Sequence, residues 1–204
     1  MNKNSIISKY WEQIAVSLLA IIVCCFWLFF YPFIPVAREM SQLFLWNGDY
    51  LTERLSVPGG IAQYLGECIT QFFINPVYAA LVYAILFVVA QQLSSKLLRQ
   101  FFPTIKSKVR FPLSLLPPIL LWYMAMLPHI PLTPTIAALL VMMIGCVVMS
   151  IHAKRTRLII LCFVIAVMYW LTGPMSILLV LCSIRWIPLT ATLFASCLIG
   201  SSYI

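Results

Sequence analysis

Long apolar runs constrain the fold of this chain more than any other feature. Apolar residues make up 63% of the 204 residues and charged residues only 9%, which leaves too little polar surface to cover a soluble globule. The runs cover residues 14–33, 72–92, 113–127, 135–151, 158–171, 175–184 and 187–204. A helix of about twenty apolar residues crosses the hydrocarbon core of a bilayer. We therefore predict an all-α polytopic transmembrane helix bundle of about six or seven apolar segments, forming a single membrane domain over residues 1–204.

The distribution of charge predicts which side of the membrane each connection faces. Four of the five acidic residues lie between the first two runs: Glu39, Asp49, Glu53 and Glu67. Basic residues gather in four other places: 3–9, 94–110, 154–157 and Arg185. Short loops rich in Lys and Arg stay cytoplasmic. We therefore expect a cytoplasmic N-terminus, a cytoplasmic basic loop at 94–110 and an extracytoplasmic segment at 36–71.

The net charge of +8 does not point to a nucleic-acid partner. The basic residues flank apolar runs, where they meet anionic lipid head groups, so the bilayer is the partner that the sequence predicts. Six of the seven cysteines lie inside apolar runs, where they pack as small hydrophobic residues. No Cys/His cluster has metal-ligand spacing, so no metal site is predicted and any cofactor is unknown.

Residues 158–185 form a short helical hairpin in our interpretation. The run 158–171 stops at Thr172-Gly173-Pro174, a turn sequence, and only about ten apolar residues follow before Arg185. The pair is either a short spanning hairpin in a thinned bilayer or a re-entrant one that turns at Gly173-Pro174. A re-entrant turn requires protein or a water-filled cavity around its free backbone groups.

The extracytoplasmic segment has the pattern of short amphipathic helices. Met40, Leu43 and Phe44 recur at helical spacing, and a second helical stretch begins after Asn47-Gly48. A third is expected after Pro58-Gly59-Gly60. Its apolar stripe is Ile61, Leu65, Cys68, Ile69 and Phe72, and its polar stripe is Gln63, Glu67 and Gln71. Such helices are typical of the membrane surface.

Two carboxylates in this segment could carry chemistry. Asp49 and Glu53 are four residues apart and share a helix face, so the pair could supply a general base or hold a divalent cation, although no specific motif supports a cation. Structural roles compete with these. Asp49 suits an N-cap after Asn-Gly, and Glu53 suits the first turn of the helix.

The remaining polar candidates face the same side in this topology. Arg38 and Arg54 could clamp a phosphate or could balance the neighbouring acids. Glu39, just beyond the first run, is either functional or an interfacial charge. His129, in a turn between prolines, is a possible base or ligand, and an interfacial residue is the simpler interpretation.

The extracytoplasmic segment resembles an uncharacterised multipass family of Bacteroidetes envelope proteins. The resemblance rests on Arg38-Glu39-Met40-Ser41-Gln42-Leu43-Phe44-Leu45, Asp49-Tyr50, Pro58-Gly59-Gly60, Tyr64-Leu65 and Thr70-Gln71-Phe72-Phe73. It covers residues 38–76 and implies a location in the bacterial inner membrane. Longer family members continue into a soluble helical region that this sequence lacks, so we expect either a whole small protein or the membrane half of a larger one.

A weaker resemblance links the arrangement to polytopic glycosyltransferases of the GT-C type. It implies that Glu39 or Asp49 deprotonates an acceptor hydroxyl, and that Arg38 or Arg54 holds the phosphate of a polyprenyl-phosphate sugar. Gln42 and Tyr50 are further candidates for substrate binding. The competing hypothesis is a non-catalytic scaffold or assembly subunit that presents this segment to an envelope protein. A transporter ranks third, because charged residues do not interrupt the middle of the well-defined runs.

Overall fold

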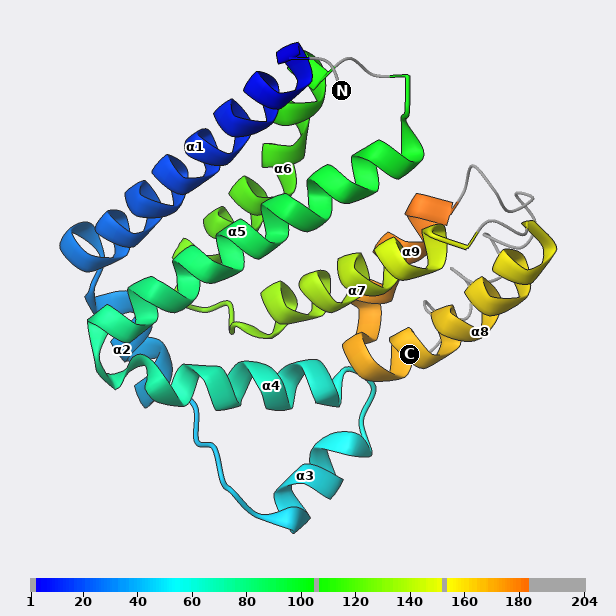
Figure 1. Cartoon of the computed structure of the whole chain (residues 1–204). Coiled ribbons are helices and arrows are strands. Elements are labelled where there is room, and N and C mark those ends of the chain that lie inside the picture. Colours follow the sequence, from blue (N-terminus) through cyan, green and yellow to red (C-terminus); the bar gives the residue numbers. More distant parts are fainter. Residues whose placement is uncertain (1–2, 105–106, 152–153, 184–204) are drawn as a thin grey trace. The chain divides into compact units, whose positions relative to one another are not determined.

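The computed structural model describes residues 3–104, 107–151 and 154–183 (Figure 1). Helices form nearly all of this part and strands none of it, which confirms the prediction of an all-α helical protein. The chain divides into two compact units. The first comprises Met1–Leu43 and Cys68–Pro131, and the second comprises Phe44–Glu67 and Leu132–Ile204.

In the first unit a long helix, α5, packs along two others. Its helical elements are α1 (Lys3–Cys25), a π-helical turn η1 (Phe26–Phe30), α2 (Phe33–Met40), a 3₁₀ turn η2 (Gln71–Ile74), α5 (Pro76–Phe101) and α6 (Ser107–Met126). Helix α5 contacts both α1 and α6 (Figure 1). Trp27 is fully buried and stacks on Tyr83 of α5, with ring centroids 4.3 Å apart. Phe73 is also fully buried and lies against Tyr83, so aromatic side chains form this part of the core.

Helix α5 differs at both ends from the predicted run 72–92. It starts at Pro76, because the side chain of Asn75 accepts a hydrogen bond from the Val77 amide at 2.9 Å and proline fits the first turn. It continues to Phe101 through residues that favour helix, among them Lys96 and Arg99. The predicted basic loop at 94–110 is therefore helical over most of its described length.

Helix α6 keeps three prolines inside one continuous helix: Pro112, Pro117 and Pro118. It covers nearly all of the predicted apolar run 113–127 and begins six residues earlier, at Ser107. Each proline removes one backbone donor from the helix. Ser114 sits in this region fully buried, donates to the Phe111 carbonyl at 2.7 Å and accepts a bond from Gln91 Nε2 of α5 at 3.2 Å. A polar contact thus ties α6 to α5.

The second unit contains α3 (Gly48–Leu55), most of α4 (Gly60–Thr70), α7 (Thr133–Met149), α8 (Lys154–Thr172), a 3₁₀ turn η3 (Gly173–Ser176) and α9 (Ile177–Ser183). Its core is aliphatic and joins α7, α8 and α9: Val141, Val148, Leu161, Ile165, Met168, Leu179 and Val180. The ribbon changes direction at η3, and α9 then lies beside α7 (Figure 1). The turn thus falls at the predicted Gly173-Pro174.

Four described helical stretches are long and apolar enough to cross a membrane: Tyr10–Phe30, Pro76–Phe101, Val109–Met126 and Ile159–Val180. A shorter apolar helix, Thr133–Met149, adds to them. These helices fit a membrane protein. The fourth stretch includes the turn at η3, so spanning and re-entry of this hairpin both stay predictions. Arg185 and the predicted run 187–204 lie outside the described residues.

The segment 36–71 departs from its predicted helices in three ways. Helix α2 ends at Met40 and residues 42–47 have no regular structure, so the predicted helical spacing of Met40, Leu43 and Phe44 was wrong. Phe44 is buried because it packs on aromatic rings of α3 and α4, whereas Leu43 is 77% exposed. The N-cap of α3 is Asn47 by its backbone, which places Asp49 inside the first turn and not at the predicted cap.

Helix α4 begins at Gly60, the last residue of the Pro58-Gly59-Gly60 sequence after which a helix was predicted, but it buries a different face. Its small residues Ala62 and Gly66 are buried, while Leu65 of the predicted apolar stripe is exposed. A Cβ atom at Gly66 would lie 3.1 Å from the Thr133 backbone nitrogen. Because the start of α7 approaches α4 this closely, α4 buries its face of small residues. Hydrophobic periodicity alone does not reveal this face.

Candidate functional site

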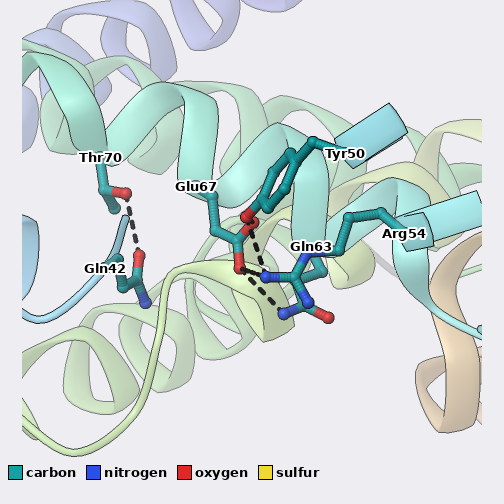
Figure 2. Close-up of polar contacts among 6 residues, drawn as sticks. All are labelled: Gln42, Tyr50, Arg54, Gln63, Glu67 and Thr70. Atoms are coloured by element: carbon teal, nitrogen blue, oxygen red, sulfur yellow. Dashed lines mark hydrogen bonds and ion pairs between the residues drawn. The ribbon is translucent and has the colours of Figure 1, made fainter. Parts of the chain in front are cut away.

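Four polar side chains of α3 and α4 form a closed network in the second unit (Figure 2). The Glu67 carboxylate accepts hydrogen bonds from Tyr50 Oη at 2.5 Å, Gln63 Nε2 at 2.9 Å and Arg54 Nη2 at 3.1 Å. Arg54 Nη2 also donates to Tyr50 Oη at 2.8 Å. We call these four residues the α3–α4 network. It joins the two helices through one carboxylate and one guanidinium.

Local sequence brings the two helices together. Tyr50 and Arg54 are four residues apart on α3, and Gln63 and Glu67 are four apart on α4, so each pair shares one helix face. The connection between the helices is tight, because a Cβ at Gly60 would lie 1.6 Å from the Arg54 carbonyl oxygen. Only glycine fits there. The Pro58-Gly59-Gly60 sequence therefore turns the chain sharply enough for α3 to face α4.

The charged side chains of the network are largely shielded from solvent. The side chains of Glu67 and Arg54 are 8% and 28% exposed, and the Arg54 guanidinium lies 4.8 Å from the centroid of the Tyr50 ring. Burial and the hydrogen bond to Glu67 raise the pKa of Tyr50 above its ordinary value, which favours the protonated phenol that donates to Glu67. Burial alone would lower the pKa of Arg54, but the hydrogen bond to Tyr50 and the charge of Glu67 outweigh it, and the pKa is raised. Each charge is thus already matched.

Aromatic side chains pack around this network. The Phe44 ring lies 5.8 Å from Tyr50 and 5.0 Å from Tyr64 between ring centroids. Trp46 meets Phe44 edge-on at 5.3 Å, yet 73% of Trp46 stays exposed. Edge-to-face aromatic pairs stabilise such a cluster by about 1 kcal/mol each beyond their buried area. In the irregular segment 44–47, the Phe44 side chain is therefore packed against neighbouring rings, while the Trp46 side chain stays exposed.

Arg38 takes a structural position in the first unit. It is 2% exposed and donates to Tyr83 Oη, to the Ala125 carbonyl at 3.0 Å and to the Leu127 carbonyl at 3.1 Å. The two carbonyls belong to the C-terminal end of α6, where the helix dipole favours a positive charge. The Arg38 guanidinium therefore links α2 to α5 and to the end of α6, and its possible roles as a phosphate clamp or as a partner of neighbouring acids stay predictions.

The other predicted site residues are not members of the α3–α4 network. Gln42 Oε1 accepts a hydrogen bond from Thr70 Oγ1 at 2.9 Å in the first unit (Figure 2). Glu39 is half-buried on α2, whereas Asp49 and His129 are exposed. Among the described residues, no group of three or more His, Cys, Asp or Glu side chains could hold a metal ion. A cation at Asp49 and Glu53, both exposed on α3, stays a prediction.

Of the predicted site residues, the structure joins Tyr50 and Arg54 in one network. The sequence had assigned Glu67 only to a polar stripe, although it is the centre of that network. The available signal was the repeat of polar residues at 63 and 67 opposite the pair at 50 and 54. A buried carboxylate beside an arginine and a tyrosine usually marks either a perturbed functional group or an internal ion pair.

Comparison with known proteins places the chain in a family and gives no further relative. Searches of the curated proteins and of the solved structures found no match. Residues 8–203 match the family described as "Family of unknown function (DUF6057)". The match includes the α3–α4 network and all four candidate spanning stretches. The chain therefore belongs to the DUF6057 family.

Proposed function

We propose that this chain is a multi-pass scaffold of the bacterial cell envelope that presents residues 38–71 on the outer side of the inner membrane to a protein partner. The α3–α4 network carries this proposal. Arg54 already has a carboxylate and a phenol as partners, and the guanidinium of Arg38 binds the end of α6. Both guanidinium groups thus have partners within the protein, which supports a structural role for the two arginines.

Exposed apolar side chains beside the network supply the surface that a partner needs. Leu45 and Trp46 lie in the irregular stretch before α3 and are at least half exposed. Protein interfaces are enriched in such aromatic residues, and a few anchors dominate their energetics. Because Phe44 fixes this stretch on Tyr50 and Tyr64, little conformational entropy is lost when a partner covers Trp46.

Lipid-linked glycosyl transfer is the second candidate, and one observation favours it. The Asp49 carboxylate is exposed and forms no ion pair among the described residues. It sits one residue before Tyr50, which the network holds in place. A positioned carboxylate of this kind can act as a general base toward an acceptor hydroxyl, with a polyprenyl-phosphate sugar as the donor.

Complementation of the envelope defect of a deletion strain separates the two functions. The scaffold predicts that Leu45→Ala/Trp46→Ala loses function at matched expression, because truncation of an interface anchor weakens binding by about tenfold or more. Glu39→Gln/Asp49→Asn then keeps function. Ile74→Ala is the control, since Ile74 is an equally exposed apolar residue outside the 38–71 segment. Loss of function in the carboxylate variant, with Leu45→Ala/Trp46→Ala active, would establish the catalytic alternative in place of the scaffold.

A further inference from the structure

A groove opens between α1 and α5 in the first unit, and most of the residues that line it are polar or charged. Its volume is about 1070 Å³, which is at the upper end of small-molecule sites at about 300–1,000 Å³. Both helices are long and apolar enough to cross a membrane. A polar groove along such helices is unusual, because polar groups that face hydrocarbon without partners are costly.

The lining changes from charged to apolar along the groove. Glu12, Lys96 and Arg99 line one end, and Ile21 and Val88 line the other. Helices α1 and α5 run in opposite directions (Figure 1), so the start of one meets the end of the other. The distance between the ends is about 15 Å, from about ten residues of helical rise. The groove therefore has the polarity gradient of a single amphiphile.

The charged end carries an excess of positive charge. Arg99 Nη2 and Glu12 Oε2 are 3.5 Å apart, a long contact between side chains that are 55% and 25% exposed. Lys96, one turn before Arg99, forms no ion pair among the described side chains. Two cations against one carboxylate leave a net charge of about +1. This charge matches a phosphate monoester or diester, and the two side chains supply several free donors.

We propose that this groove binds an anionic membrane lipid, with the headgroup phosphate on Lys96 and Arg99 and an acyl chain along Ile21 and Val88. The lipid neutralises the excess charge and covers the apolar end in the same step. Basic pockets between helices on one membrane face bind anionic head groups in this way. The site shares no residue with the surface proposed for a protein partner.

Thermal unfolding of the purified full chain in detergent tests the site. Phosphatidylglycerol should raise the Tm more than phosphatidylcholine does, because a ligand stabilises the state that it binds. Lys96→Gln/Arg99→Gln should remove the difference in Tm between the two lipids, with at least a tenfold loss of apparent affinity for phosphatidylglycerol. Lys154→Gln/Arg155→Gln is the matched control, since it removes two positive charges from a different basic cluster of the sequence.

Two further measurements distinguish loss of lipid binding from instability of the double variant, and a lipid ligand from free phosphate. Lys96→Gln alone leaves the Arg99–Glu12 contact intact and should still weaken the phosphatidylglycerol effect severalfold, even where the double variant is too unstable to purify. Inorganic phosphate with phosphatidylcholine should give no stabilisation. An unchanged phosphatidylglycerol effect in the groove variants, an equal loss in the control, or full stabilisation by inorganic phosphate would each overturn the lipid site.

Discussion

Glu67 is the residue on which the α3–α4 network depends most. Its carboxylate accepts bonds from α3 and from its own helix, and it is the ion-pair partner of Arg54. A buried acceptor of several charge-assisted bonds leaves unmatched groups behind when it is removed. The charge of Arg54 would then lie against an uncharged side chain in a partly dry site.

Glu67→Gln should therefore lower the stability of the fold by about 1–3 kcal/mol, with the lower part of the range favoured because Arg54 is partly solvated. The Tm in detergent measures the effect. Glu53→Gln is the matched control: Glu53 is exposed on α3, and its replacement should change stability by less than about 0.5 kcal/mol. Equal Tm values for the two variants would show that the network does not hold α3 on α4.

Two glycines form a close backbone contact between two turns of the second unit. Gly59 has a φ of 87° and Gly173 a φ of 64°, both in the left-handed region. The Gly59 amide donates to the Trp170 carbonyl at 2.8 Å, and a Cβ at Gly173 would lie 3.4 Å from Gly59 Cα. The turn before α4 and the turn after α8 thus meet through backbone atoms, which requires small residues at both positions.

Replacement of Gly173 by alanine should lower stability by about 1–3 kcal/mol, because the left-handed backbone disfavours a side chain. Gly48→Ala provides the control. A Cβ at Gly48 would meet no atom within 4 Å, and Gly48 has no positive φ, so its change should be neutral or slightly stabilising at the start of α3. If the Gly173→Ala protein had an unchanged Tm in detergent, the contact between the two turns would not require glycine at this position.

The sequence was sufficient to predict helices but not the faces that they bury. Apolar runs and the Pro58-Gly59-Gly60 turn predicted the long helices and the start of α4, because these are local signals. The burial of Glu67 depends on Arg54 and Tyr50, which are 13 and 17 residues away. The burial of Arg38 depends on carbonyls 87 and 89 residues away. Periodicity carries no information about such contacts. The sequence therefore left two roles open for Arg38 and Arg54, which were binding of a phosphate and balance of the neighbouring acids.

At the scale of the whole molecule, charge and apolar length together predict how the chain lies in the membrane. The acidic segment 36–71 lies between two stretches that are long enough to span, and the basic clusters lie at the other ends of these stretches. The positive-inside rule then predicts that the α3–α4 network faces outward and that the groove end with Lys96 and Arg99 faces the cytoplasm. Both proposed sites depend on this single orientation.

Single-cysteine labelling of spheroplasts with a membrane-impermeant maleimide tests that orientation most directly. In a cysteine-free background, cysteines at the exposed positions of Trp46 and His129 should react from outside. Cysteines at Lys106, Arg155 and Arg185 should react only after permeabilisation; Lys106 and Arg185 lie outside the described residues. Labelling after permeabilisation controls for accessibility. Modification at Lys106 from the outside, with Trp46 protected, would invert the topology and contradict the presentation of residues 38–71 on the outer side.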